Sequence, residues 1–248
     1  MGKVAIVTGG SRGIGAATCA LLAAAGCDVA VVFRSDELAA SDVVKRCLAA
    51  GVRAVAVQGD VGLEADVLRV FTSVDDELGP LGILVNNAGI VGSKARVDQL
   101  GVERLEHMMQ VNVVGPFLCA REAVLRMSTL HGGSGGVIVN VGSAAARLGA
   151  PGEYVDYAAS KGAVDSMTVG LAKEVAGEGI RVNCVRPGII RTEIHASGGQ
   201  PDRADHMAPL VPMQRAGEAD EVAAAIAWLC SDAASFVTGA LLDVSGGR

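Results

Sequence analysis

Short apolar runs that alternate with longer helical patterns are the feature that most limits how this chain can fold. Runs with the length of strands lie at 3–8, 28–33, 52–58, 83–86, 136–141, 181–185 and 241–244. Helical patterns lie between them, near 14–25, 36–50, 63–78, 102–127, 154–177 and 218–231. Mainly apolar strands separated by helices are typical of a parallel sheet with helical crossovers.

The order of these elements predicts the fold class. Right-handed crossovers give a single-domain, Rossmann-like α/β fold, a doubly wound parallel sheet of about seven strands with helices on both faces. The length of 248 residues fits one domain, 1–248, because no linker marks a boundary. The irregular stretch 188–217 is too long for a simple connection, and we interpret it as a loop that covers a functional site.

Composition and charge exclude several kinds of partner. With 21 Lys and Arg against 27 Asp and Glu, the net charge is −6, and aromatic residues make up 3%. We therefore expect no nucleic-acid and no membrane partner. No signal peptide is recognisable, so a cytoplasmic protein is expected. The six cysteines show no C-x-x-C spacing and are interpreted as reduced thiols. The four histidines show no metal-ligand spacing, so no metal is expected.

A glycine-rich turn follows the first predicted strand and opens a helix, and it reads Thr8-Gly9-Gly10-Ser11-Arg12-Gly13-Ile14-Gly15. Gly9 permits a tight turn, Gly13 lets the backbone approach a pyrophosphate, and Gly15 lets the helix pack closely. The free N–H groups at the helix start favour phosphate. The segment indicates dinucleotide binding, although a purely structural turn is the alternative.

The end of the second predicted strand bears on the choice of cofactor. NAD favours a carboxylate at this place, whereas the 2′-phosphate of NADP favours a cation. Here the chain has Arg34 and Ser35, and Arg12 lies within the glycine turn. The two arginines favour NADP(H), with NAD(H) possible. The alternative is that both are ordinary solvated charges.

Tyr157 and Lys161 lie four residues apart on a predicted helix and therefore share a face. A nearby ammonium favours the phenolate and brings the pKa of the tyrosine toward neutral pH, as an acid–base catalyst needs. Ser143 follows a predicted strand, and its hydroxyl could bind a substrate oxygen. Asn112 lies among valines in a predicted helix and could hold a water connected to Lys161.

Each of these residues also has an ordinary structural explanation. The Tyr-Lys pair could be a surface pair, Ser143 a capping hydroxyl, and Asn112 a partner for a backbone group. A hydrolase is disfavoured because no G-x-S-x-G motif surrounds Ser143.

Together these features resemble the short-chain dehydrogenase/reductase family in its form of about 250 residues. The resemblance spans the chain and rests on TGGSRGIG at 8–15, Asp60-Val61, NNAG at 86–89, Asn112, Ser143, YAASK at 157–161, and Pro187-Gly188 followed by Thr192. One departure is Gly142 before Ser143, where many members have Ser-Ser. Around Tyr157 and at 194–199 the chain resembles bacterial sugar or 3-oxoacyl reductases, which is a weak guide to substrate.

The resemblance implies roles for particular residues. It implies a catalytic tetrad of Asn112, Ser143, Tyr157 and Lys161. The cofactor-binding residues expected from the turn, the arginines and the resemblance are Gly9, Ser11, Arg12, Gly13, Ile14, Gly15, Arg34, Ser35, Asp60, Val61, Asn87, Ala88, Gly89, Tyr157, Lys161, Pro187, Gly188, Ile190 and Thr192.

The sequence thus predicts an NADP(H)-dependent oxidoreductase. Hydride would pass between nicotinamide and a carbonyl or secondary alcohol, with Tyr157 as acid and base. The alternatives are an NAD(H)-preferring sugar or alcohol dehydrogenase of the same family and a non-catalytic dinucleotide sensor. A third alternative is a sugar epimerase or dehydratase of the longer related branch. The glycine turn of that branch resembles T-G-x-x-G-x-x-G, whereas the turn at 8–15 reads T-G-x-x-x-G-x-G.

The substrate is expected to be a small carbonyl or alcohol compound, in a pocket formed by Val91, Ala144, Pro151, Tyr154, Ile189 and the 193–213 loop. A homotetramer is expected from the family resemblance, from an apolar C-terminal segment 236–244 and from surplus apolar positions, namely Val113, Phe117, Val164, Met167 and Leu171. The alternative is that these residues belong to the core of one subunit.

Overall fold

The computed structural model describes residues 2–248, apart from the side chain of His195. Within that range the main sheet has seven parallel strands in the order β3-β2-β1-β4-β5-β6-β9. Their bounds are β1 Val4–Thr8, β2 Asp28–Phe33, β3 Ala54–Gln58, β4 Leu81–Asn86, β5 Gly136–Val141, β6 Ile180–Pro187 and β9 Leu241–Val244. The seven predicted strands are therefore confirmed, with shifts of a few residues at their ends.

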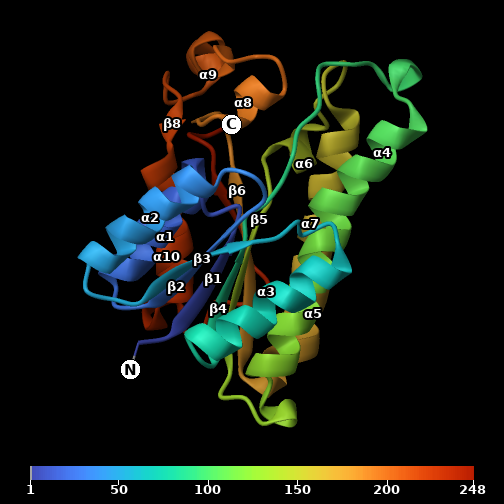
Figure 1. Cartoon of the computed structure of the whole chain (residues 1–248). Helices are drawn as coiled ribbons and strands as arrows, with labels where there is room; N and C mark the ends of the chain where they lie inside the picture. Colours follow the sequence, from blue (N-terminus) through green and yellow to red (C-terminus); the bar gives the residue numbers. More distant parts are fainter. Residues whose placement is uncertain (1) are drawn as a thin grey trace.

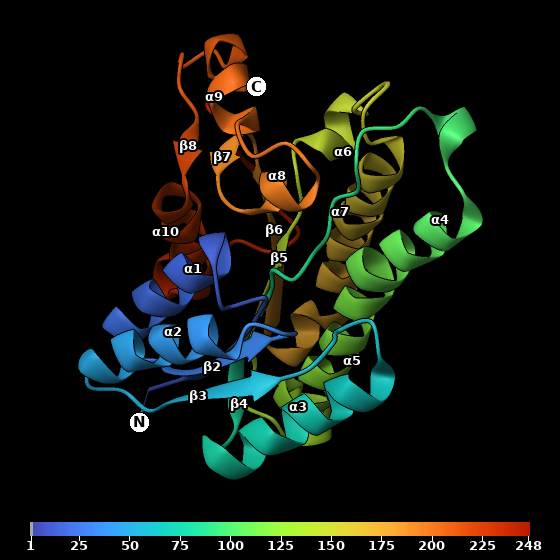
Figure 2. The same ribbon diagram turned by 45° about the horizontal axis from the view of Figure 1, so that its top comes forward.

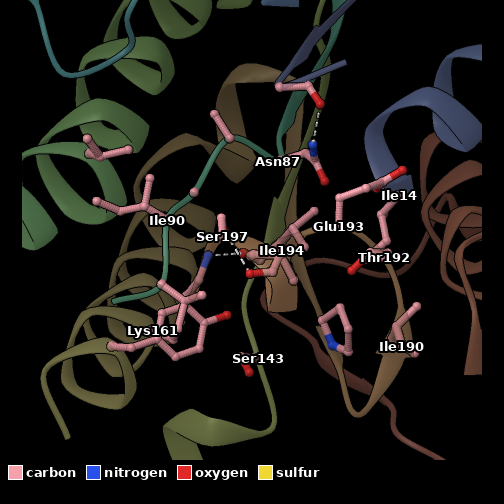
Figure 3. Close-up of a pocket in the computed structure, with 18 of the residues that line it drawn as sticks. Ile14, Asn87, Ile90, Ser143, Lys161, Ile190, Thr192, Glu193, Ile194 and Ser197 are labelled. Carbon is pink, nitrogen blue, oxygen red and sulfur yellow. Dashed lines mark hydrogen bonds between the residues drawn. The ribbon is translucent and has the colours of Figure 1, made fainter. Parts of the chain in front are cut away.

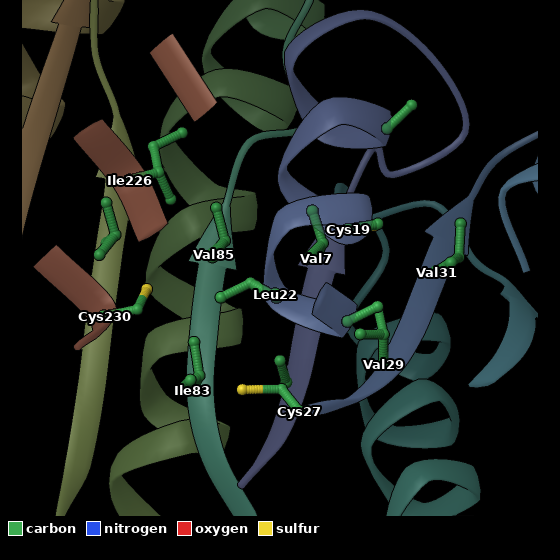
Figure 4. Packing of buried hydrophobic residues seen from close by; sticks show 14 of the residues in the cluster. Val7, Cys19, Leu22, Cys27, Val29, Val31, Ile83, Val85, Ile226 and Cys230 are labelled. Atoms are coloured by element: carbon green, nitrogen blue, oxygen red, sulfur yellow. The ribbon is translucent and has the colours of Figure 1, made fainter. Parts of the chain in front are cut away.

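Helices cover both faces of the sheet (Figure 1). One layer holds α1 (Gly13–Ala24), α2 (Glu37–Ala49) and α10 (Ala219–Cys230), and the other holds α3 (Glu64–Glu77), α5 (Gly115–Met127) and α7 (Val155–Val175). In the first layer Leu22 and Ile226 pack against Val7 and Val85 of the sheet (Figure 4). This arrangement is the doubly wound α/β fold that the apolar pattern predicts.

The predicted helix 102–127 is interrupted. The structure has α4 (Val102–Met109), a π-helical turn at Gln110–Val114, and then α5. Propensity and periodicity do not reveal such a turn, in which Asn112 bonds the backbone of Ile90 outside the helix. The turn places Asn112 in the interior, where it is fully buried.

The predicted loop 188–217 contains more structure than expected. The short strands β7 (Ile190–Arg191) and β8 (Gly217–Glu218) pair in parallel at its two ends, and α8 (Ile194–Ser197) and α9 (Arg203–Met207) lie between them. Figure 2 shows α8 and α9 at the same end of the molecule as α6 (Ala145–Leu148). The stretch thus folds over the carboxyl ends of the strands.

The apolar positions singled out for subunit contacts differ in burial. Val164 and Met167 are buried, and Leu171 packs against the core of this same chain. Phe117 on α5, by contrast, is 52% exposed, and Phe236 near the carboxyl end is fully exposed. Interpreting Val164 and Met167 as surplus apolar positions is therefore wrong, because both fill this chain's own core.

Candidate active site

A cleft of about 430 Å³ opens at the carboxyl ends of the strands. β1 and β4 are neighbouring strands in the sheet. The chain continues from β1 to α1 on one face and from β4 to α5 on the other face. Ligands of open α/β sheets bind where neighbouring strands diverge in this way. Lys161 and Ile90 lie on one side of the cleft, and Ile14 and Thr192 on the other (Figure 3). The predicted residues that line it are Gly9, Ser11, Arg12, Ile14, Arg34, Ser35, Asp60, Val61, Asn87, Ala88, Gly89, Ser143, Tyr157, Lys161, Pro187, Gly188, Ile190 and Thr192.

Three predicted residues lie outside this lining. Gly13 borders an adjoining hollow that it shares with Arg12, and Gly15 is buried beneath the turn. Asn112 lies behind the wall of the cleft, bonded to the backbone of Ile90. All three still contact the part of the structure that forms the cleft.

The turn after β1 is fastened to the end of β4. Asn87 Nδ2 donates to the carbonyl oxygens of Thr8 and Gly9 at 2.9 and 3.0 Å. Gly9 has a φ of +62°, and a Cβ there would lie 3.0 Å from Ala88 Cα. A Cβ on Gly15 would lie 2.6 Å from Asn87 Nδ2. Glycine is therefore required at both positions for the turn and β4 to approach each other.

The start of α1 can receive an anion. No side chain among the described residues caps its first N–H groups, and Ser11, Arg12 and Ile14 beside them line the cleft. A Cβ on Gly13 would lie 3.2 Å from Thr192 Cγ2, which brings the segment after β6 close to the same turn. These groups fit a pyrophosphate, as the glycine spacing predicts.

Arg12 and Arg34 border the same end of the cleft and are both exposed. Within residues 2–248 neither guanidinium forms an ion pair with a protein carboxylate. Asp60, which lines the cleft beside them, accepts a hydrogen bond from Gly62 N at 2.9 Å, so it is held by its own loop. The two arginines thus remain available to an anionic group.

Ser143, Tyr157 and Lys161 meet at the other end of the cleft. Ser143 follows β5, while Tyr157 and Lys161 lie on the first turns of α7, on one face as predicted. The Ser143 hydroxyl lies close enough to the Tyr157 phenol to influence its pKa. Lys161 Nζ donates to Val141 O at 2.8 Å and lies 5.8 Å from the centre of the Tyr157 ring. The amine has two further N–H donors for a ligand.

Burial shifts the pKa values of both titratable groups. It raises the pKa of Tyr157, and the hydrogen bond to Ser143 opposes this shift. It lowers the pKa of Lys161 to about 8, while Cys184 and Asp165 act in the opposite direction. The sequence argument expected Lys161 to lower the pKa of Tyr157. In this structure the pKa of Tyr157 is raised instead, and desolvation of the phenol is the largest cause.

Asn112 is held by backbone groups, as its alternative interpretation predicted. Its Oδ1 accepts from Ile90 N at 2.8 Å, and its Nδ2 donates to Ile90 O at 2.9 Å and to Ser160 Oγ at 3.1 Å. A Cβ on Gly89 would lie 3.4 Å from both Asn112 Oδ1 and Lys161 Nζ. Asn112 therefore holds the segment that follows β4, and this segment lies beside Lys161.

Polar side chains attach α9 to the start of α7 beside the cleft. Arg203 Nη2 bonds Glu153 Oε2 at 2.6 Å, and its Cζ lies 5.1 Å from the ring centre of Tyr154. Gln200 bonds the Tyr154 hydroxyl, and Lys94 pairs with Glu153 at 2.7 Å. The bond from Arg203, with help from Lys94, lowers the pKa of Glu153 to about 2.

Sequence reasoning found Tyr154 but missed Glu153 and Arg203, because 50 residues separate the two and no spacing connects them. Of the expected pocket residues, Val91, Ala144, Tyr154 and Ile189 line the cleft. Pro151 is exposed and lies outside the lining. The loop's Ile194, Ser197 and Arg203 do line it.

No metal site is found in the described part of the chain: no three His, Cys, Asp or Glu side chains gather there. The His195 side chain lies outside that part. All six cysteines are free and buried. Within residues 2–248 no helix has the length and apolar character needed to cross a membrane.

Known proteins share this fold and sequence. A family model described as enoyl-(acyl carrier protein) reductase matches residues 9–248. The chain is 55% identical over 245 residues to the uncharacterized oxidoreductase YgfF of Escherichia coli (strain K12), covering 99% of each.

Two solved structures are similar over nearly the whole chain. A short-chain dehydrogenase from Burkholderia cenocepacia J2315 in complex with NADP is 36% identical, with a TM-score of 0.91, covering 100% of this chain and 98% of that one. A 3-ketoacyl-(acyl-carrier-protein) reductase from Brucella melitensis complexed with NADH is 34% identical, with a TM-score of 0.92 and the same coverage.

The fold and the cleft define the class, a doubly wound α/β protein with a glycine turn at one end of its cleft and serine, tyrosine and lysine at the other. The sequence and structure matches then identify the family. The chain belongs to the short-chain dehydrogenases/reductases and is an oxidoreductase that acts on alcohol or carbonyl groups.

Proposed function

We propose that this chain is an NADP(H)-preferring carbonyl reductase or alcohol dehydrogenase in which Tyr157 is the acid and base. The observation that carries the proposal is the meeting of Ser143, Tyr157 and the buried Lys161 in a cleft whose other end holds Arg12 and Arg34. The proposed catalytic domain is residues 1–248, with the stretch 188–217 as its substrate lid. The similar structures in complex with NADP and with NADH support a nicotinamide dinucleotide.

The cofactor would bind along the cleft. The uncapped N–H groups of α1 fit its pyrophosphate, and the free donors of Lys161 fit a ribose hydroxyl. Arg12 and Arg34 fit the 2′-phosphate, since neither is paired within the described residues. When bound, the nicotinamide ring supplies or accepts the hydride.

Tyr157 would move the proton. Because burial raises its pKa, the phenol is protonated at neutral pH and can donate to a carbonyl oxygen that is being reduced. Ser143, whose hydroxyl lies beside the Tyr157 phenol, would hold that same oxygen. The charge of Lys161 would stabilise the phenolate that remains, and the buried Asn112 would complete the proton relay.

Steady-state kinetics with the two cofactors tests the proposal. With a panel of ketones, 3-oxoacyl thioesters and sugars, kcat/KM should be higher with NADPH than with NADH. Each charge-assisted bond to the phosphate is worth about 1.5–3 kcal/mol, so Arg34→Asp should lower the NADPH value by about tenfold or more and reverse the preference. Lys45→Gln, a charge change on the exposed face of α2, serves as control.

Other outcomes would identify the alternatives. Equal kcat/KM for the two cofactors in the unmodified protein would contradict the preference, and a higher value with NADH would favour the NAD(H)-dependent dehydrogenase. Dinucleotide binding without turnover across the whole panel would favour a sensor. A sensor has no need for Ser143, Tyr157 and Lys161 together.

A further inference from the structure

Arg248 lines the cleft, and its guanidinium has no partner among the described residues. Its Nη1 is buried and forms no hydrogen bond, and the group takes part in no ion pair within residues 2–248. Burying a charged donor without a partner is costly, so such a group is expected where a ligand completes its bonds.

The backbone around Arg248 places it at the catalytic end of the cleft. Its carbonyl oxygen accepts from Arg147 Nη2 on α6 at 2.7 Å and from Ser245 Oγ at 2.8 Å. Ser245 packs on the end of β6, since a Cβ on Gly188 would lie 2.7 Å from Ser245 Cα. α6 begins two residues after Ser143, so Arg248 is anchored next to the predicted substrate position.

No side-chain carboxylate in the described lining of the cleft pairs with this cation. Asp36 and Asp60 lie at the end with Arg34, far along the cleft from Ser143. Glu193 lies beside the glycine turn, where its Oε2 would be 3.5 Å from a Cβ on Gly13. These three carboxylates therefore lie toward the dinucleotide end.

At the catalytic end the remaining carboxylate of the described lining is Glu153, and it is already bonded to Arg203 and Lys94. Together those three groups carry a net charge of +1, which adds to the positive charge of Arg248. The side chains at the catalytic end of the cleft therefore carry a net positive charge.

We propose that the substrate is a small carbonyl or hydroxy compound that carries a carboxylate, and that Arg248 binds this carboxylate. One planar guanidinium matches one carboxylate in charge and in geometry, whereas a dianionic phosphate would need further unpaired cations. The proposal rests on the proposed function, because it names the substrate class of the same site.

Paired substrates test it by activity. In NADPH-dependent reduction, Arg248→Gln should lower kcat/KM for 4-oxopentanoate by about tenfold to a hundredfold, the size of a charged hydrogen bond. It should leave ethyl 4-oxopentanoate nearly unchanged, and Arg248→Lys should restore part of the loss. Lys45→Gln should change neither substrate. An equal effect of Arg248→Gln on acid and ester, or no effect on either, would overturn the proposal.

A binding measurement separates this proposal from the proposed function. Calorimetry with NADP⁺ present would compare hexanoate with hexanamide, which differ in charge and cannot be reduced. Hexanoate should bind more tightly, and Arg248→Gln should abolish the difference. No preference for hexanoate in the unmodified protein, including no binding of either compound, would overturn the role of Arg248. Failure to reduce the ester would count against the proposed function alone.

Discussion

Tyr157 is the side chain on which the proposed chemistry depends most directly. Tyr157→Phe removes only the hydroxyl, and acid–base catalysis by such a group is worth about 10²–10⁴ in rate. We expect kcat to fall by that factor while the Kd for NADPH, measured by fluorescence titration, stays nearly unchanged. Ala159→Ser, a change of one hydroxyl at an exposed position of α7, is the matched control. Retention of about a tenth of the activity or more would mean that another group donates the proton.

Lys161 makes a separate prediction at the same scale, because its folded-state pKa of about 8 lies below the ordinary 10.5. Between those values the unfolded chain binds more protons, so this residue makes the free energy of unfolding rise with pH from about 8 to 10.5. The gain is roughly 3 kcal/mol at most.

Urea denaturation of the cofactor-free protein measures this effect, with Lys161→Met as the reference. The free energy of unfolding of the unmodified protein should rise across that window relative to that of Lys161→Met, because methionine carries no proton to lose. Parallel curves for the two proteins would show that the lysine is not desolvated as the structure has it.

At the scale of elements, the end of β5 fits β6 because residue 142 lacks a side chain. A Cβ on Gly142 would lie 2.7 Å from Cys184 Sγ and 3.2 Å from Arg186 Cγ. This explains the departure from Ser-Ser, because the thiol of Cys184 occupies the space that a side chain at position 142 would need. The two positions are therefore expected to be coupled in stability.

Gly142→Ala should lower the free energy of unfolding by about 1–3 kcal/mol, as overpacking does. In a protein that already carries Cys184→Ala, Gly142→Ala should cost about 1 kcal/mol less, because the obstructing sulfur is gone. Urea denaturation of the four proteins of the cycle measures both values. Additive costs would show that Cys184 is not the obstacle.

For the whole molecule, we expect a homotetramer. Phe117 on α5 and Phe236 near the carboxyl end are large apolar side chains exposed on separate elements, and we expect another subunit to cover each. Light scattering should give about four times 25.0 kDa, and Phe117→Asp or Phe236→Asp should each yield smaller species. A stable 25.0 kDa species of the unmodified protein would contradict the prediction.

The sequence by itself determined the features that depend on near neighbours along the chain. Apolar runs and helical periods predicted the seven strands and the two-sided sheet, since backbone geometry fixes these periods locally. The glycine turn and the four-residue spacing of Tyr157 and Lys161 could be predicted for the same reason.

Only the tertiary structure decided which distant groups meet. Asn112 in the π-helical turn bonds Ile90, Arg203 of α9 bonds Glu153, and the backbone of Arg248 bonds Arg147, 101 residues away. The raised pKa of Tyr157 likewise comes from burial rather than from its spacing to Lys161. Periodicity carries no information about such pairs, because packing of the whole chain brings them together.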